Sequence, residues 1–296
     1  MNNKILDGKT LGMKIRESLK ERVEQLKSKG VTPGLGVILV GENPASVIYV
    51  NSKEKACQKA GIFTITRRFP AEIDEKTIFQ KIDEFNNDDR IHGILVQLPL
   101  PPHINEAKTL RKILPEKDVD GFHPMNLGKL MLGEETFVPC TPLGIVELMK
   151  YYGINPEGKN TVILGRSNIV GKPLANLLIQ KREWSNATVT VCHTKTENIT
   201  KHTKKADILI AAMGRAEIIK GDMVKRGVVV IDVGQNKVID PEAKKGYRLV
   251  GDVEFSSVFP KAKAITPVPG GVGPMTIAML LSNTVKSAES KIEKGG

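Results

Sequence analysis

The sequence predicts a two-domain α/β protein, with an N-terminal α/β domain and a Rossmann-like domain built on a doubly wound parallel sheet. The chain has 296 residues, which is enough for two ordinary domains. Strand-like apolar runs alternate with helical patterns along most of it. One of these runs, V-I-L-G-R-S-N-I-V-G, passes through a glycine-bounded polar turn into a helical pattern. That order is typical of a nucleotide-binding domain.

The first half follows a β-α-β-α-β order after an N-terminal helix. Between residues 8 and 29, apolar residues recur at intervals of three or four, which marks one face of a helix. Alternating strands and helices of this kind predict a parallel sheet with helices on its faces. The expected strands cover residues 34–40, 63–69 and 91–100, and the expected helices cover residues 45–60 and 75–86.

Polar residues in this half fall on loops that follow expected strands. Active sites of parallel sheets lie beyond the carboxyl ends of the strands. Residues 41–44 and 97–102 are such loops, and residues 118–121 (D-V-D-G) lie on a later polar connection. We therefore expect these three segments to face the site.

The second half repeats the alternation. A helix starting near the P-C-T-P run is expected to continue to Met149, and a second helix is expected over residues 173–181. The expected strands cover residues 162–165, 187–192, 208–212 and 228–233. The tail, residues 275–292, is a long helical pattern that we expect to return to the first domain. The domains are therefore predicted as 1–140 plus 276–296 and 141–275, with a cleft between them.

Composition narrows the functional class. The formal net charge of +11 favours anionic partners such as nucleic acid, phosphorylated cofactors or polycarboxylates, although a host with a basic proteome would give the same excess. No basic run is interleaved with aromatic residues, so we expect no nucleic-acid partner. The three cysteines are widely separated, which predicts packing rather than a metal site or disulfides. No signal peptide or membrane segment is visible, which predicts a cytoplasmic protein.

The turn after residue 164 predicts a cofactor. A dinucleotide domain that binds NAD usually carries an acidic residue at the end of its second strand, but here that strand ends in T-V-C-H-T-K-T. Cations and hydroxyls at these two loops would suit a ribose 2′-phosphate, so NADP is favoured over NAD. The alternative is a simple helix-capping turn, with Ser167 or Asn168 as the cap. The candidates for the phosphate are Arg166, Ser167, His193, Thr194 and Lys195.

Tyr49 and Lys53 are four residues apart on an expected helix, so they share one face. Tyr-x-x-x-Lys can act as a proton-transfer pair, but in short-chain dehydrogenases such a pair follows the nucleotide loop, whereas here it precedes it. The structural alternative is a surface lysine beside a packing tyrosine. Gln97 and Asp120 favour a functional role for Tyr49 and Lys53 over the structural alternative, because their loops are expected to converge near the same cleft.

Five runs together resemble one family. They are Y-V-N-S-K (49–53), V-Q-L-P-L-P (96–101), E-K-D-V-D-G-F-H-P (116–124), G-R-S-N-I-V-G-K-P (165–173) and P-V-P-G-G-V-G-P-M-T (267–276). Their order and spacing resemble the bifunctional methylenetetrahydrofolate dehydrogenase/methenyltetrahydrofolate cyclohydrolase family over essentially the whole chain. The resemblance implies NADP-dependent oxidation of 5,10-methylenetetrahydrofolate, followed by hydrolysis of the methenyl product to 10-formyltetrahydrofolate. It also implies a homodimer that serves one-carbon metabolism and purine biosynthesis.

The resemblance implies a role for each matched residue. Lys53 would be central to the hydrolysis and Gln97 would tune it by a hydrogen bond, while Tyr49 would orient the folate and Asp120 would hold the pterin's amino edge. The other residues implied in substrate binding are Leu98, Pro269, Gly270, Gly271 and Gly273. Those implied in NADP binding are Gly165, Arg166, Ser167, Ile169, Thr194 and Gln235, and no metal is implied.

Two positions depart from the family pattern. The family usually has serine where this chain has Thr194, and an aliphatic residue where it has Gln235. Both lie on the cofactor side, so they concern coenzyme preference rather than the reaction. Two rival functions remain: a monofunctional dehydrogenase, which an intact set of Lys53, Gln97 and Asp120 argues against, and a basic nucleic-acid-binding protein, which would leave the five motifs unexplained.

Overall fold

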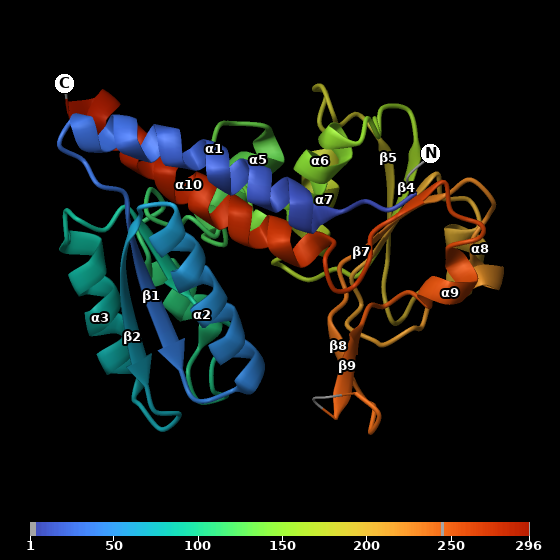
Figure 1. Cartoon of the computed structure of the whole chain (residues 1–296), viewed down its shortest axis with the longest axis horizontal. Coiled ribbons are helices and arrows are strands. Elements are labelled where there is room, and N and C mark those ends of the chain that lie inside the picture. The colour runs from blue at the N-terminus through green and yellow to red at the C-terminus, as the bar shows by residue number, and fades with distance from the viewer. Residues whose placement is uncertain (1–3, 244–245, 296) are drawn as a thin grey trace. The chain divides into compact units, whose positions relative to one another are not determined.

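The computed structural model describes residues 4–243 and 246–295, which divide into two compact units (Figure 1). The three-stranded unit comprises Met13–Cys140 and the chain from Ile277 onward. The five-stranded unit comprises Thr141–Thr276 and the described residues up to Gly12. The first twelve positions therefore group with the second unit, whereas the sequence assigned them to the first. Both sheets are parallel, which confirms the predicted two-domain α/β class.

The sheet of the three-stranded unit has the order β2-β1-β3. β1 (Gly34–Val40) is central and is buried along its whole length because its sequence, GLGVILV, is entirely apolar or glycine. β2 (Phe63–Phe69) and β3 (Gly93–Val96) pair with it in parallel register. The helices of this part of the chain are α2 (Pro44–Lys59), α3 (Glu75–Asn87), α4 (Glu106–Lys112) and α5 (Pro124–Leu132).

Two long helices, α1 (Gly8–Ser28) and α10 (Val272–Gly295), run side by side (Figure 1). In the three-stranded unit, the guanidinium of Arg22 on α1 donates to both carboxylate oxygens of Glu289 on α10, at 2.9 and 2.6 Å. The apolar stripe expected on α1 is buried, as shown by Leu19, which is 1% exposed, and by Val23, which is fully buried. Burial of that stripe, more than the exposed ion pair, stabilises the helix against the unit.

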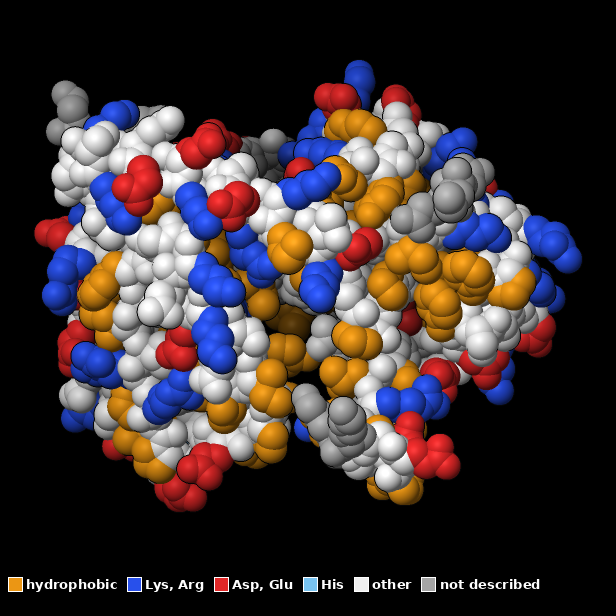
Figure 2. All heavy atoms as spheres, viewed as in Figure 1, with side chains coloured by type: hydrophobic (Ala, Val, Ile, Leu, Met, Phe, Trp, Pro, Cys, Tyr) orange, Lys and Arg blue, Asp and Glu red, His pale blue; other side chains and the backbone are white. Residues whose placement is uncertain are grey.

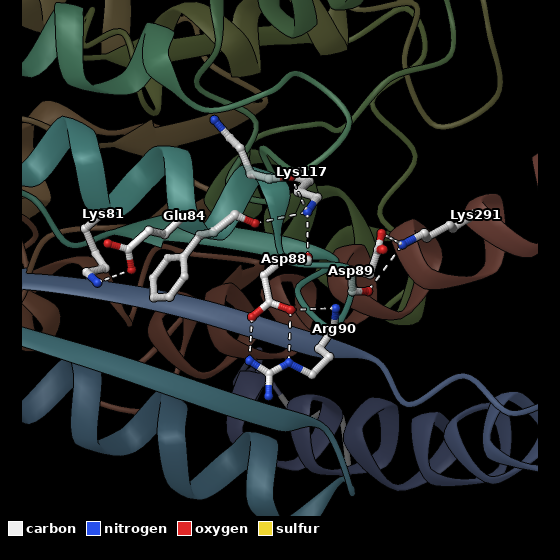
Figure 3. A network of polar contacts seen from close by, with 9 residues as sticks. Lys81, Glu84, Asp88, Asp89, Arg90, Lys117 and Lys291 are labelled. Carbon is white, nitrogen blue, oxygen red and sulfur yellow. Dashed lines mark hydrogen bonds and ion pairs between the residues drawn. The ribbon is translucent and has the colours of Figure 1, made fainter.

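The turn between α3 and β3 is held by a network of polar contacts (Figure 3). The ammonium of Lys117 donates to three backbone carbonyls at the end of α3, those of Phe85, Asn86 and Asp88, at 2.7–3.0 Å. Lys291 of α10 donates to the carboxylate of Asp89 at 2.6 Å. These contacts satisfy carbonyls that the helix leaves unpaired at its end and fix the entry into β3.

The sheet of the five-stranded unit has the order β10-β7-β6-β4-β5. The strand order reverses beside β4: β5 lies on one side, and β6, β7 and β10 follow on the other. In doubly wound sheets a dinucleotide binds at this reversal. The strands are β4 (Asn160–Leu164), β5 (Thr188–Cys192), β6 (Ile208–Ala211), β7 (Val229–Asp232) and β10 (Ala264–Ile265).

Shorter elements complete this unit. An antiparallel hairpin, β8 (Asn236–Ile239) with β9 (Tyr247–Val250), follows β7. The helices are α6 (Cys140–Tyr151), α7 (Gly171–Leu178), α8 (Ile199–Thr203), α9 (Phe255–Val258) and the 3₁₀ turn η1 (Gly221–Met223). The core packs apolar side chains of the strands, among them Val162, Leu164, Leu209 and Val230, against the loops and helices around them.

Within residues 4–243 and 246–295, no helix is long and apolar enough to cross a membrane. The same residues contain no group of three or more His, Cys, Asp or Glu side chains arranged to hold a metal ion. On the face drawn in Figure 2, basic side chains are interspersed with acidic ones. The basic side chains seen on that face therefore have acidic neighbours.

Candidate functional site

The helix α2 carries the first two predicted site residues. It starts after Asn43, whose side-chain oxygen accepts hydrogen bonds from the amides of Ala45 and Ser46 at 3.0 and 3.2 Å. Tyr49 and Lys53 follow one helical turn apart. Lys53 is only 9% exposed, which is unusual for a lysine. Its burial means that the ammonium must find partners within the protein.

The partner is Gln97, the first residue after β3. The Nζ of Lys53 donates to Oε1 of Gln97 at 3.0 Å. Gln97 is held in place by its backbone amide, which donates to the carbonyl of Ile38 on β1 at 2.9 Å, and by its Nε2, which donates to the carbonyl of Leu98 at 2.7 Å. Because Nε2 is occupied in this way, Oε1 is turned toward the lysine. The expected convergence of the helix with this loop is present.

Tyr49 is 38% exposed, so its ring is accessible for stacking. Partial burial raises the pKa of its phenol above the ordinary value, and the hydroxyl keeps its proton at neutral pH. Lys53 directs its ammonium to Gln97. An accessible ring and an ammonium bonded to a different residue suit separate roles for the two side chains.

Asp120 lies on a turn organised by its neighbour Asp118. The carboxylate of Asp118 is buried and accepts from the amides of Phe122 and His123 at 3.2 and 2.7 Å, and from Nδ2 of Asn126 at 2.8 Å. Gly121 has φ +75°, and a Cβ there would lie 2.6 Å from the nitrogen of Pro139. In the D-V-D-G run, Asp118 and Gly121 therefore fix the turn that carries Asp120.

Two opposing effects act on the pKa of the Asp120 carboxyl. Burial raises the pKa of its carboxyl, while the positive charge of Lys53 and a hydrogen bond with Cys140 lower it. The Sγ of Cys140 also lies 3.3 Å from the carbonyl of Val119. Burial and the nearby Asp120 charge raise the pKa of the Cys140 thiol, so it stays protonated. Lys53, Gln97 and Asp120 thus form one electrostatic cluster in the three-stranded unit.

In the five-stranded unit, the turn after β4 closes onto the start of α7. Gly165 has φ +125°, and a Cβ there would collide with the carbonyl oxygen of Ala212 after β6. The hydroxyl oxygen of Ser167 accepts from the amides of Val170 and Gly171 at 3.1 and 3.4 Å. The cap residue of α7 is Val170, which makes no side-chain capping bond, so neither Ser167 nor Asn168 is the helix cap that the alternative expected. The Ser167 hydroxyl hydrogen remains able to donate to a phosphate.

The side chains expected at a ribose phosphate lie at the surface. Arg166, Ser167 and Ile169 are exposed on the turn after β4, and Thr194 and Lys195 are exposed after β5. The paired register of the two strands, with Leu164 opposite Cys192, brings both turns to the same edge of the sheet. No acidic residue lies among residues 188–196, so this edge fits an additional phosphate better than a bare ribose.

Gln235 also meets the first turn of α10, which follows the glycine-rich loop, in this unit. A Cβ on Gly273 would lie 2.5 Å from Nε2 of Gln235, so the exposed glutamine side chain lies directly beside that glycine. Gly270 has φ +113°, and its carbonyl accepts from the amide of Lys9 at 2.9 Å. Pro269 is exposed on the same loop. These positions, distant in sequence, follow β7 and β10, which are neighbours in the sheet.

Two buried carboxylates, Asp232 and Asp252, were absent from the sequence prediction. They are 4% and 0% exposed. Burial, together with the negative charge of Asp252, raises the pKa of Asp232 to about 7, while three backbone amides oppose that rise. The available signal was the acidic residue inside two apolar runs, V-I-D-V-G and L-V-G-D-V, where a charge is unexpected.

The predicted residues thus separate by unit. The three-stranded unit holds Tyr49, Lys53, Gln97, Leu98 and Asp120. The five-stranded unit holds all the others, namely Gly165, Arg166, Ser167, Ile169, His193, Thr194, Lys195, Gln235, Pro269, Gly270, Gly271 and Gly273. The first set offers an ammonium, an amide and a carboxylate, and the second offers a turn at the strand reversal, where a doubly wound sheet binds a dinucleotide.

Comparison with known proteins matches two domains of one family to this chain. The chain matches the catalytic domain of tetrahydrofolate dehydrogenase/cyclohydrolase over residues 6–120 and the NAD(P)-binding domain of the same enzyme over residues 139–292. The bifunctional protein FolD of Chlorobium chlorochromatii is 56% identical over 286 residues, which cover 96% of this chain and 97% of that protein.

Solved structures of the family superpose on nearly all of the chain. The bifunctional FolD enzyme of Campylobacter jejuni has a TM-score of 0.91 at 52% identity and covers 97% of this chain and 99% of its own. The Trypanosoma brucei methylenetetrahydrofolate dehydrogenase-cyclohydrolase, solved with NADP cofactor and an inhibitor, has a TM-score of 0.93 at 39% identity, with 98% of each chain covered. Both domains, in the expected order, confirm that the chain belongs to the tetrahydrofolate dehydrogenase/cyclohydrolase family.

Proposed function

We propose that this chain oxidises 5,10-methylenetetrahydrofolate to 5,10-methenyltetrahydrofolate with NADP and hydrolyses that product to 10-formyltetrahydrofolate. Membership of the dehydrogenase/cyclohydrolase family supports both reactions. The observation that carries the hydrolytic half is the buried Lys53–Gln97 hydrogen bond beside Asp120. A monofunctional dehydrogenase would have no need to keep this set.

Lys53 is the central residue of the hydrolysis in this proposal. Water must attack the methenyl carbon between two nitrogens and lose a proton, and an amine held at one position can accept or relay that proton. Gln97 fixes the amine through the 3.0 Å bond. One lysine can therefore serve a step that hydride transfer does not require.

Tyr49 and Asp120 position the folate. The accessible tyrosine ring offers a stacking surface, and the raised pKa keeps it neutral beside a cationic intermediate. Asp120 accepts hydrogen bonds from the amino edge of the pterin, which replaces the solvent lost on burial. Leu98 supports the same ring through the loop that follows Gln97. Oxidation needs mainly such alignment, because the adjacent nitrogens of the substrate already stabilise the cation that forms.

The five-stranded unit binds NADP, which accepts the hydride when bound. Arg166, Ser167 and Thr194 contact the 2′-phosphate, and Gly165 allows the close backbone approach that a dinucleotide requires. Ile169 covers the cofactor with its exposed side chain, and Gln235 lies on the nicotinamide side. Pro269, Gly270 and Gly273 border the folate and the nicotinamide. Support comes from the shared sheet edge and from the non-acidic end of β5.

The proposal also includes the localisation, the oligomeric state and the metabolic role of the enzyme. The enzyme is a cytoplasmic homodimer whose product supplies one-carbon units to purine biosynthesis. The dimer is testable by sedimentation at micromolar concentration. A species of twice 32.4 kDa is expected, and a stable particle of 32.4 kDa would contradict the dimer.

The function is tested by a spectrophotometric assay with 5,10-methylenetetrahydrofolate, run first with NADP and then with NAD. Reduced coenzyme should form with NADP in preference to NAD. In a second assay, methenyltetrahydrofolate supplied alone should lose its absorbance faster with enzyme than without it. Activity in the first assay without the second would favour the monofunctional alternative, and activity in neither would refute the proposal.

A further inference from the structure

Asp232 and Asp252 form a buried pair of carboxylates at the carboxyl edge of the five-stranded sheet. Asp232 is the last residue of β7, and Asp252 follows β9. Their contact is direct through the backbone, because the amide of Asp252 donates to Oδ1 of Asp232 at 2.9 Å. Two buried acids so close together are costly unless each is well supplied with donors. The hydrogen-bond donors to the two carboxylates identify the loops that the pair holds in place.

The carboxylate of Asp252 accepts hydrogen bonds from the loop that follows β6. Its Oδ2 accepts from the amides of Met213 and Gly214 at 2.5 and 2.9 Å, and its Oδ1 accepts from the amide of Arg215 at 3.0 Å. Its Oδ1 also accepts from Nδ2 of Asn236, at the start of β8, at 2.9 Å. Four donors from two segments therefore converge on one carboxylate.

Asp232 makes hydrogen bonds with the loops that follow β7, β9 and β10 along the same edge of the sheet. Its carboxylate accepts from the amides of Gly234 and Val253, each at 2.9 Å. Its own amide donates to the hydroxyl of Thr266 at 2.7 Å, directly after β10. A Cβ at Gly234 or at Gly251 would collide with the carboxylate of the facing aspartate, so both glycines are needed for this close packing.

The loops held by this pair follow β6, β7 and β10, on one side of the strand reversal at β4. In a doubly wound sheet the adenosine half of a dinucleotide lies over the side that here carries β5, and the pyrophosphate lies at the first turn. The nicotinamide half is then left to the β6–β7 side. The loop after β6 also supports the first turn, because Ala212 packs against Gly165.

We propose that Asp232 and Asp252 are positioning residues that shape the nicotinamide half of the NADP site by fixing the loops after β6, β7 and β10. The inference rests on the proposed function, since it presupposes NADP in this unit. It assigns the adenosine half to the separate turns after β4 and β5. The two halves of the cofactor should therefore respond differently when the pair is altered.

Asp252→Asn is the main test, because it replaces an oxygen that faces amide donors with a group that is itself a donor. Binding is measured with two probes, NADP and 2′,5′-ADP, the latter carrying only the adenosine half and its 2′-phosphate. We expect the Kd for NADP to rise by about tenfold or more, since charge-assisted bonds to the loop are lost. The Kd for 2′,5′-ADP should stay within about twofold, and hydrolysis of supplied methenyltetrahydrofolate should persist.

Asp207→Asn is the matched control. Asp207 also accepts a backbone amide, that of Asn160 at 2.9 Å, but it precedes β6 at the opposite edge of the sheet. It should alter stability without changing the ratio of the two Kd values. If Asp252→Asn does not fold, Asn236→Ala removes a single donor to Asp252, and its NADP Kd should rise by a few fold with 2′,5′-ADP unaffected.

Equal weakening of both probes, or no change in either, would overturn the inference, because the pair would then stabilise the unit as a whole or not act on the site. A parent protein that bound neither NADP nor 2′,5′-ADP would instead refute the proposed function, and this inference with it. Retained 2′,5′-ADP binding in the variant reports that the unit is folded. A selective loss of NADP affinity is thus the one result that the proposal requires.

Discussion

The ammonium of Lys53 lies 3.0 Å from the side-chain oxygen of Gln97, joining the middle of α2 to the residue that follows β3. This bond fixes one amine at the carboxyl edge of the three-stranded sheet. The lysine is 9% exposed, and the positive charge it carries also lowers the pKa of Asp120 against the effect of burial. Replacing this amine should therefore affect the chemistry of the site more than the fold.

Lys53→Ser should separate the two activities. Hydrolysis of supplied methenyltetrahydrofolate should fall by at least roughly 100-fold, the usual cost of losing an acid–base group. Oxidation of methylenetetrahydrofolate should decline less, because it depends on alignment, so the methenyl intermediate should accumulate. Both rates follow from absorbance.

Lys55→Ser provides the matched control for this test, because Lys55 lies on the same helix but is exposed. Both of its activities should remain near those of the parent. If a folded Lys53→Ser protein hydrolysed methenyltetrahydrofolate at the parent's rate, the assigned role of Lys53 would be wrong and the lysine would be structural.

Arg166→Ala should weaken NADP far more than NAD. Only NADP carries the 2′-phosphate that an exposed guanidinium after β4 would contact, and loss of one charge-assisted contact of this kind should raise its KM by about tenfold or more. The measurement is KM for each coenzyme with saturating methylenetetrahydrofolate. Lys159→Ala removes an exposed cation before β4, at the other end of the strand, and should change neither KM. Equal losses for both coenzymes would give Arg166 another role.

Much of the fold could be predicted from the sequence because its strands are continuous apolar runs. β1 and β2 match the expected residue ranges, since each run is long and bounded by turn residues. The third strand, Gly93–Val96, is shorter than expected at both ends. At its C-terminal end, prolines at 99, 101 and 102 have no amide to donate to a ladder. The β8–β9 hairpin was missed, as its residues are largely polar or half-exposed and lack the pattern of a buried strand.

The candidate site could be predicted only in part, for a physical reason. The loops of Gln97 and Asp120 were expected to converge because active-site loops of parallel sheets lie beyond the carboxyl ends of the strands, a rule that needs no side-chain detail. The Lys53–Gln97 hydrogen bond was implied by the family resemblance alone. The Asp232–Asp252 pair depends on loop conformations that bring three amides onto each carboxylate, and periodicity carries no information on such contacts. The individual roles of the site residues stay predictions until variants are measured.

Gly171→Ala should impair NADP binding without abolishing hydrolysis. A Cβ at this position would collide with the carbonyl oxygen of Gly165 and lie 2.9 Å from Cα of Arg166, so the turn after β4 must open. The Kd for NADP, measured by calorimetry, should rise by about tenfold or more, since a phosphate loop binds through fixed backbone donors. Gly128→Ala is the control, because nothing lies within 4 Å of a Cβ there. Unchanged NADP affinity in Gly171→Ala would show that this turn does not hold the cofactor.

His92 should make the protein sensitive to acid. Its side chain is 5% exposed, and its Nδ1 accepts from the amide of Gly34 at 3.2 Å, which requires that nitrogen to be unprotonated. Burial first, and then the positive charges of Lys291 and Lys117 (Figure 3), lower the pKa of His92 from 6.5 to about 4. The native state therefore favours the neutral imidazole, whereas the unfolded chain takes up a proton near pH 6.5.

The sign of the effect follows from that difference. The stabilisation is fully present above pH 6.5 and is lost as the pH falls from 6.5 to about 4, by up to about 3 kcal/mol. His92→Asn supplies an oxygen for the Gly34 amide but does not titrate, so its free energy of unfolding should fall less steeply over this range in urea titrations. His103→Asn, which alters an exposed histidine of the same unit, should keep the parent's slope. The three proteins have the same carboxylates. The difference between their slopes of unfolding free energy against pH therefore gives the contribution of His92. Identical slopes for the parent and His92→Asn would mean that the buried imidazole is not the group that makes the native state acid-sensitive.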